Sequence, residues 1–320
     1  MDTASNVAGQ EQAASAWPPL PLDAWQDTYD TLHMWTQIVG KVKLELCPYL
    51  NEWWEVALHP TARGLTTLPM PMERGALEIS FDFVDHNLRL CTTAGAVKAM
   101  PLIPRSVADF YHELMATLRA MGVEVTINTL PDEVEHAIPC DQDHVHASYD
   151  PEYANRWWRI LIQASKVFAR YRSPFVGKSS PVQFFWGSFD LSETRFSGQL
   201  AEPPKGANHI LRLAEDQENI AAGFWPGGGK IAGPAFYSYT YPEPAHFKTA
   251  SVQPSAARYD ADLGEFILLY DDVRQADSPE EALLAFLRST YEAGADLAHW
   301  DRQRLERPVP DVGGKRRRTG

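Results

Sequence analysis

The sequence contains few cysteines, no long apolar run and no excess of basic residues. Its three cysteines, Cys47, Cys91 and Cys140, show no paired spacing, so we expect reduced thiols rather than a disulfide framework. No window holds about 18 consecutive apolar residues, so we expect no membrane-spanning helix. The formal net charge of −13 argues against general nucleic-acid binding, which requires a basic surface.

Familiar catalytic motifs are also missing. The sequence has no dinucleotide-binding GxGxxG in a strand–helix context, no phosphate-binding GxxxxGK[ST] and no nucleophile elbow GxSxG. The N-terminus has no basic segment followed by an apolar run, so we expect no signal peptide and a cytoplasmic protein. These motifs assign no reaction, and the sequence decides neither whether the protein is an enzyme nor its oligomeric state.

The composition is that of an ordinary soluble globular protein. The 320 residues are 44% hydrophobic and 22% charged, which suits one large or two ordinary domains. Alternating apolar residues predict strands, and short links between them predict antiparallel pairing. Capping residues predict helices after Ser106 and Ser278 and from about Pro151 to Tyr171. The predicted fold class is α+β, with antiparallel sheets and segregated long helices.

Several local predictions define the expected elements more closely. A first helix is expected to end at Gly40, and the last helix is expected to run to about Leu305. Strands are predicted where polar and apolar residues alternate, at 41–47, 53–59, 76–85 and 123–130.

The chain is predicted to consist of two α+β halves. The first spans 17–135 and the second 136–306, with an irregular insertion at 200–234. The segments 1–16 and 307–320 are predicted to be a disordered N-terminus and a disordered basic tail. A VGK triplet occurs in both halves, ending at Lys41 and Lys178, and each half closes with a capped helix. These similarities favour a tandem helix–sheet–helix repeat, although two unrelated α+β halves would also produce them.

The segment 175–198, FVGKSSPVQFFWGSFDLSETRFSG, combines aromatic and charged residues. We interpret it as one wall of a pocket for a small organic molecule that could carry an anionic group, because ligand sites combine aromatic walls with a few polar groups. An arginine or lysine there would meet an anionic group. A hairpin ion pair between Asp190 and Arg195 is the structural alternative. The candidate ligand-binding residues are Lys178, Trp186, Asp190, Arg195, Trp225 in the GFWPGGG loop, and Arg63 as the first-half counterpart of Arg195.

An acidic segment suggests a different function. His144 and His146 would lie on one side of an extended chain, and Asp141 and Asp150 could complete a divalent metal site. Metal-dependent hydrolysis is therefore an alternative function. The structural alternative is that these side chains form local hydrogen bonds and cap the following helix. A third possibility is a non-catalytic interaction module, and the sequence indicates no other cofactor.

The chain resembles a family of uncharacterised bacterial proteins catalogued as domain of unknown function 5996. The resemblance rests on GK at 40–41, NEWWEVAL at 51–58, ARGLTT at 62–67 and SFDFVDH at 80–86. It continues through the segment 175–198, GFWPGGG, PAFYSYTYPEP and WDRQRLE, and covers about residues 17–306. The family carries no activity that the resemblance could imply.

Overall fold

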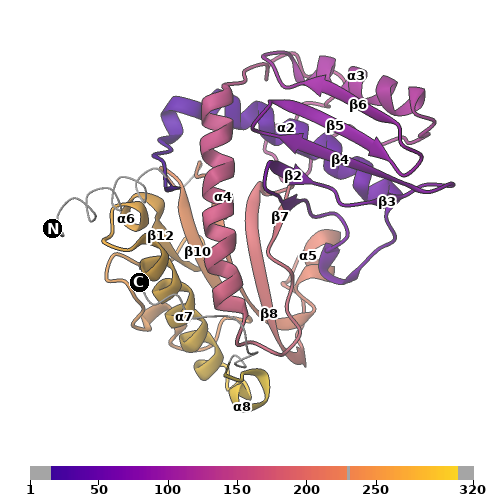
Figure 1. Ribbon diagram of the computed structural model, residues 1–320. Helices are drawn as coiled ribbons and strands as arrows, with labels where there is room; N and C mark the ends of the chain where they lie inside the picture. Colours follow the sequence, from indigo (N-terminus) through magenta and orange to yellow (C-terminus); the bar gives the residue numbers. More distant parts are fainter. Residues whose placement is uncertain (1–15, 229–230, 309–320) are drawn as a thin grey trace, which may run out of the picture.

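The computed structural model describes residues 16–228 and 231–308. It contains two six-stranded antiparallel sheets and several helices, which confirms the predicted α+β class (Figure 1). The predicted termini fall outside the described residues, apart from positions 16, 307 and 308. The two sheets differ in strand order, and the proposed tandem repeat is not confirmed.

The first sheet comes from the first half of the chain. Its strand order is β1-β2-β4-β5-β6, and β3 pairs with the end of β4. Two helices pack with this sheet, α2 (Leu22–Leu46) and α3 (Val107–Ala120). The strands are β1 (His59–Pro60), β2 (Gly64–Thr66), β3 (Met70–Pro71), β4 (Ala76–Asp82), β5 (Asn87–Thr92) and β6 (Val97–Pro101).

The second sheet comes from the second half of the chain, in the order β11-β12-β10-β9-β8-β7. Its strands are β7 (Gln183–Phe185), β8 (Asp190–Leu200), β9 (Gln217–Trp225), β10 (Ala235–Tyr241), β11 (Arg258–Asp260) and β12 (Glu265–Leu269). The remaining helices are α4 (Pro151–Arg172), α5 (His209–Ala214), α6 (Tyr270–Arg274), α7 (Pro279–Leu297) and α8 (Arg302–Leu305), with short 3₁₀ turns η1 (Asn51–Trp53) and η2 (Phe247–Thr249).

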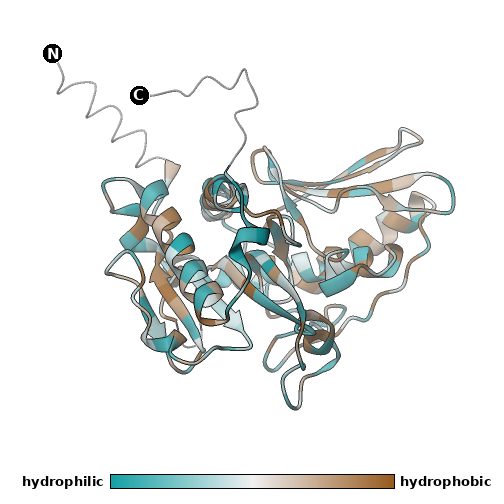
Figure 2. Cartoon of the chain, turned by 90° about the horizontal axis from the view of Figure 1, so that it is seen from below, coloured by the Kyte–Doolittle hydropathy of each residue, from teal (hydrophilic) through white to brown (hydrophobic). Residues whose placement is uncertain are grey.

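Helix α4 packs against both halves of the structure. Figure 1 shows it upright in front of the second sheet, with β7 and β8 on one side of it and β10 and β12 on the other, and Figure 2 shows it end-on near the middle of the molecule. Its residue Trp157 is fully buried and stacks on Phe189, with ring centroids 4.7 Å apart. The main chains of Leu58 and Phe184 exchange two hydrogen bonds of 2.8 Å, which joins the two sheets at their edges.

The capped helices begin where the sequence predicts. Ser106 accepts a hydrogen bond from the main-chain N–H of Asp109 and caps α3. Asp150 accepts from the first turn of α4, whose first residue is Pro151. The final predicted helix begins at Pro279, although the side chain of Ser278 makes no capping hydrogen bond. It ends at Leu297 rather than near Leu305, and α8 follows separately.

Three predictions in the first half of the chain are wrong. Helix α2 does not end at Gly40 but continues to Leu46, so 41–47 is helix rather than strand. A β-carbon at Gly40 would overlap the indole of Trp186, so the glycine serves close packing rather than helix termination. Residues 53–59 form mostly turns, because Glu52 and Trp53 adopt positive φ angles of 52° and 61°.

Two further segments differ from their predicted structure. The segment 123–130 buries Val123 and Ile127 but pairs with no strand among the described residues. The segment 200–234 was expected to be an irregular insertion, but residues 217–225 form β9 between β8 and β10. Its run of small residues concealed the apolar alternation that a strand normally shows. Among the described residues, none of the helices combines the length and apolar character needed to cross a membrane.

Candidate functional site

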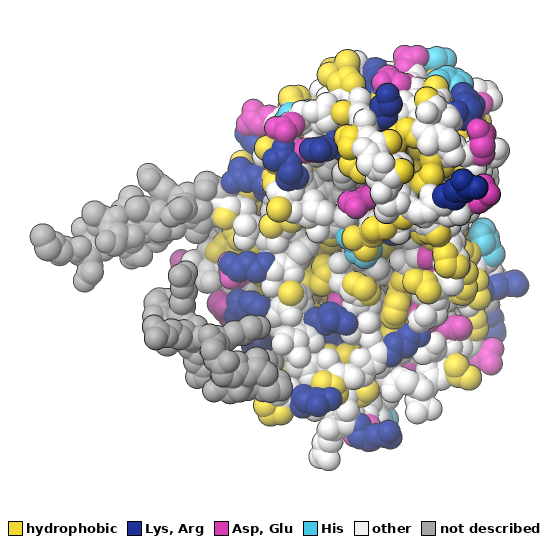
Figure 3. Space-filling view, turned by 45° about the vertical axis from the view of Figure 1, so that its right-hand side comes forward, with side chains coloured by type: hydrophobic (Ala, Val, Ile, Leu, Met, Phe, Trp, Pro, Cys, Tyr) yellow, Lys and Arg dark blue, Asp and Glu magenta, His cyan; other side chains and the backbone are white. Residues whose placement is uncertain are grey.

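A cavity of about 480 Å³ lies between the end of α2, the turn η1, helix α5 and one face of the second sheet. This volume is within the usual range for small-molecule sites. In Figure 3, hydrophobic side chains gather in a band across the middle of the molecule. The lining residues are Lys41, Leu44, Glu45, Glu52, Trp53, Trp54, Val56, Asn128, Asp132, Glu133, Phe185, Trp186, Gly187, Ser188, Asp190, Ser192, Thr194, Phe196, His209, Ile210, Leu211, Ala214, Glu215, Asn219, Tyr237 and Tyr239.

The second sheet supplies one wall through the alternation of its side chains. On β8 the cavity is lined by Asp190 and by every second residue after it, through Phe196. On β9 the facing position is Gly223, where a β-carbon would overlap the ring of Tyr237. Because Gly223 has no side chain, Tyr237 lies across β9 and donates its hydroxyl hydrogen bond to Asp190 on β8.

A polar row on α2 holds the loop that carries Asp132 and Glu133. Gln37 donates to the carbonyl of Asp132 at 2.8 Å and accepts from its main-chain N–H at 3.1 Å. The ammonium of Lys41 lies 2.6 Å from the Asp132 carboxylate. His33, Gln37 and Lys41 are four residues apart and share one face of α2, which continues past the predicted end at Gly40.

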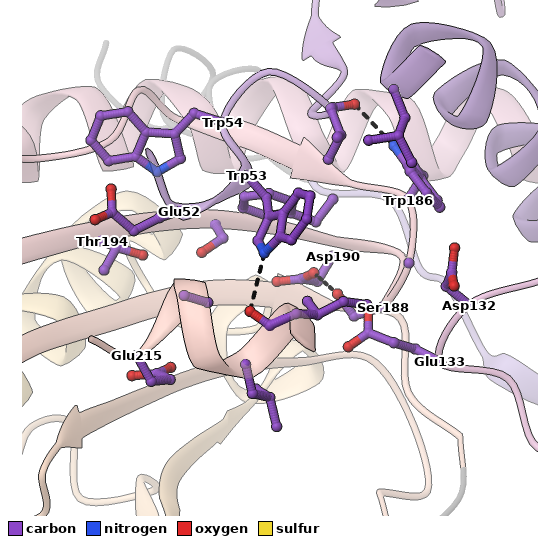
Figure 4. Close-up of a pocket in the computed structure, with 18 of the residues that line it drawn as sticks. Glu52, Trp53, Trp54, Asp132, Glu133, Trp186, Ser188, Asp190, Thr194 and Glu215 are labelled. Atoms are coloured by element: carbon purple, nitrogen blue, oxygen red, sulfur yellow. Dashed lines mark hydrogen bonds between the residues drawn. The ribbon is translucent and has the colours of Figure 1, made fainter. Parts of the chain in front are cut away.

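The turn η1 and helix α5 cover the cavity together. Trp53 donates its indole N–H to the carbonyl of Ile210 in α5 at 3.1 Å. Glu52 is buried and forms an ion pair with Lys178. Positive φ angles at consecutive non-glycine residues are costly, and such strain concentrates at functional sites. Here the strained backbone directs Trp53 into the cavity (Figure 4).

The side chains that line the cavity are mainly acidic where they are charged. Six carboxylates line the cavity: Glu45, Glu52, Asp132, Glu133, Asp190 and Glu215. Among the described lining residues Lys41 is the single lysine or arginine, and it is already paired with Asp132.

The protonation of these acids depends on their burial. Glu133 is exposed as a residue, but its carboxyl lies against Gly187 in the lining. Desolvation there raises the pKa of Glu133 to about 7, and the neighbouring Asp190 and Asp132 add to the rise. Burial also raises the pKa of Asp190 and of Glu215, although hydrogen bonds from neighbouring side chains act against the rise in both. A positively charged ligand would stabilise the ionised carboxylates and so offset the cost of their desolvation.

Comparison with known proteins places the chain in a family. A family model described as Family of unknown function (DUF5996) matches residues 17–307, which is most of the chain. The chain belongs to the DUF5996 family. No curated protein and no solved structure matches it at a significant level. Every cavity-lining residue of this DUF5996 protein lies within the matched span.

Three of the residues predicted from the sequence lie at the cavity. Trp186 and Asp190 line it directly. Trp186 donates its indole N–H to the carbonyl of Val56 at 2.9 Å, and Asp190 accepts from Ser188 and Tyr237. Lys178 borders the cavity, because it contacts Glu52 and lies 4.3 Å from the ring centroid of Phe196.

The other three predicted ligand-binding residues lie elsewhere. Arg195 lies five residues after Asp190 on β8, so its side chain points to the opposite face of the sheet. There it faces the helices and is only 2% exposed. Trp225 packs at the far end of β9 against the small apolar cluster of Ile231, Ala235 and Ile267. Arg63 pairs with Asp82 and Asp85 in the first sheet. Arg195 was the main residue expected to bind an anionic ligand, and it does not line the cavity.

The four predicted metal ligands are placed differently. Asp150 caps α4, and His146 hydrogen-bonds to the buried Asp143 with 2.6 Å between Nδ1 and Oδ2. His144 is exposed. Within 16–228 and 231–308, no three His, Cys, Asp or Glu side chains are arranged to hold a metal ion. Neither predicted aspartate contacts these histidines through a hydrogen bond that the structure shows.

Sequence reasoning missed much of the lining. It named neither Glu52 and Trp53 nor Glu133 as site residues, and Tyr237 and Tyr239 appeared only within the PAFYSYTYPEP motif. Alternation in PAFYSYTY was the available signal, since it places the two tyrosines on one face of β10. A short helix near 210–220 was predicted, and α5 lies there, but no signal marked Glu215 at its end as a site residue.

Proposed function

We propose that this DUF5996 protein binds a small organic cation in the cavity beneath η1 and α5. The observation that carries the proposal is the charge of the lining: six carboxylates accompany one lysine that is already paired. Carboxylates close together in a partly dry site repel one another and any anion, whereas a cation compensates their charge.

The aromatic residues of the lining support the same ligand class. Trp53, Trp54 and Trp186 present indole rings, and Phe185 and Phe196 add further aromatic surface. A cation over such a ring gains roughly 0.5–2 kcal/mol, most when the site is shielded from water. Aromatic walls would also pack against the carbon skeleton of an organic amine, which a bare metal ion lacks.

The test is a thermal-shift screen at low ionic strength, with primary amines, carboxylic acids and sugars on the wild-type protein and on Asp190→Asn. We expect amines to raise Tm, by about 5 °C when the ligand is present at 100 times its Kd. The shift should shrink in Asp190→Asn and at high salt, because salt screens the attraction between charges.

The matched control is Glu135→Gln, which removes a carboxylate from an exposed position outside the lining. It should keep the full response to amines. Stabilisation by carboxylic acids or sugars but not by amines would contradict the proposal, as would an equal response of Asp190→Asn and the wild type.

A further inference from the structure

Five of the six cavity carboxylates are placed around Trp53 in Figure 4. In the view of Figure 4, Glu52 and Glu215 lie on one side of Trp53, Glu133 and Asp132 lie on the other, and Asp190 lies just below Trp53. Glu52 and Asp132 are paired with lysines, Lys178 and Lys41. Uncompensated acids therefore remain at both ends of the cavity.

The first end is built on Asp190. Its carboxylate accepts one hydrogen bond from Ser188 at Oδ1 and one from Tyr237 at Oδ2, and the residue is 6% exposed. An ionised carboxylate offers about four acceptor positions, so about two remain for a ligand. Since these neighbours already hold the carboxylate in place, a bound donor would not have to order it.

The second end is built on Glu215 and Asn219. Glu215 accepts from Tyr239 at 3.0 Å and from the amide nitrogen of Asn219 at 2.6 Å. That nitrogen also donates to the carbonyl of Gln217, which fixes the orientation of the amide. The Oδ1 atom of Asn219 is consequently buried without a hydrogen-bond partner among the described residues, although Asn219 lines the cavity and is 1% exposed.

An unsatisfied buried acceptor indicates a missing donor. Leaving such a group unpaired costs about 1–3 kcal/mol. An ammonium group carries three donors and no acceptor, so one group could satisfy Asn219 Oδ1 and a free position on Glu215. A hydroxyl could satisfy Asn219 but would leave the charge of Glu215 uncompensated.

The spacing of the two ends is set by neighbouring tyrosines. Tyr237 and Tyr239 are two residues apart on β10, and their rings stack with centroids 6.4 Å apart and an interplanar angle of 12°. Each hydroxyl bonds a different acid, which keeps Asp190 and Glu215 apart along the strand. Trp53, Ile210 and Leu211 line the space with apolar surface, which suits a methylene chain.

Resting on the proposed function, we propose that the ligand is a linear aliphatic polyamine with two terminal ammonium groups. One terminus binds the carboxylate of Asp190, and the other binds Glu215 and Asn219. The methylene chain between them packs against Trp53. A monoamine would compensate one end and leave the other carboxylate without a countercharge.

Titration calorimetry at low ionic strength tests this with putrescine, cadaverine, hexamethylenediamine and spermidine, each beside a monoamine of similar carbon number. We expect affinity to depend on chain length with one optimum, and the best polyamine to bind roughly tenfold tighter than its monoamine. Asp190→Asn and Glu215→Gln should each reduce polyamine affinity to the monoamine level. Glu218→Gln is the matched control on β9, since Glu218 lies outside the lining and pairs with Ser197.

The outcomes separate the two proposals. If monoamines bind as tightly as polyamines of every length, the two-ended ligand is wrong while the cation site stands. If no amine binds the wild type, the proposed function fails and this inference fails with it. The length dependence is measured on the wild type alone, so the test does not depend on either variant folding.

Discussion

At the scale of single residues, Asp190 and Arg195 show what the sequence could and could not reveal. Both were predicted to border one pocket, on either side of a turn. Instead the turn precedes Asp190, and both residues lie on the continuous strand β8. Their separation by an odd number of positions places them on opposite faces. The residue types correctly indicated a site near Asp190. Because the turn was predicted between the two residues, Arg195 was expected on the wrong face of the sheet.

Arg195 has a structural environment of its own. Its guanidinium lies 3.4 Å from the ring centroid of Tyr171 and donates to the carbonyl of that residue at 2.6 Å. The buried carboxylate of Glu193 lies 3.5 Å away, and the rings of Phe175 and Tyr291 complete the enclosure. The guanidinium of Arg195 therefore contacts residues of α4 and α7 from β8, and it is not available to bind a ligand.

Glu133 predicts a specific pH dependence of stability. Its pKa is raised from 4.5 to about 7 by desolvation and by Asp190 and Asp132, the latter paired with Lys41. Between these values the folded protein keeps a proton that the unfolded chain has released, so this residue lowers stability as pH rises from about 4.5 to about 7. Glu133→Gln should therefore exceed the Tm of the wild type by more at pH 8 than at pH 5, and the gain should be small because solvent screens the interactions of an exposed residue.

Thermal unfolding of the ligand-free protein across this pH range checks the expectation for Glu133. The control is Glu135→Gln, which should follow the wild-type curve because Glu135 lies outside the cavity lining. Parallel curves for Glu133→Gln and the wild type would show that the carboxyl of Glu133 titrates alike in the folded and unfolded states.

At the scale of elements, local signals predicted some helices and failed where tertiary packing decides. The starts of α3 and α4 follow from Ser106 and Asp150, because capping is a local interaction. The end of α2 does not follow from Gly40, since its reason lies in Trp186, far along the sequence. The alternation in 123–130 is genuine, because Val123 and Ile127 are buried, yet no strand of the described part of the chain pairs with this segment.

Gly40 yields a prediction about α2. In an isolated helix, Gly→Ala stabilises by up to about 1 kcal/mol. Here the added β-carbon would overlap the buried indole of Trp186, and overpacking costs about 1–3 kcal/mol. Gly40→Ala should therefore lower the free energy of unfolding, measured with urea. In a Trp186→Leu background the same substitution should be neutral or stabilising, because the smaller side chain leaves room.

A Gly40→Ala protein as stable as the wild type would contradict this account of α2. So would an equal effect of the substitution in the two backgrounds, because the cost is assigned to one pair of residues. Such a double-mutant cycle isolates their interaction from the general effect of an extra methyl group in a helix.

At the scale of the whole molecule, the two halves share one hydrophobic core. A single cluster of buried residues extends along the chain from Trp17 to Trp300. Trp157 of the second half contacts Trp25 and Phe83 of the first, with ring centroids 6.4 and 5.6 Å away. Paired hydrogen bonds between Leu58 and Phe184 join the sheets. The candidate site depends on the same arrangement, because its lining comes from α2 and η1 as well as from the second sheet.

This shared core predicts that the halves do not fold separately. Losing the packing of one large aromatic residue costs about 3–5 kcal/mol, and a typical domain is stable by only about 5–15 kcal/mol. Separating 17–135 from 136–306 exposes Trp157 and several of its neighbours at once. Each half expressed alone should lack cooperative thermal unfolding, whereas 17–306 should unfold in a single calorimetric transition whose calorimetric and van't Hoff enthalpies agree. Cooperative unfolding of either isolated half, or two resolved transitions in the longer chain, would instead make the halves independent domains and the cavity a site between them.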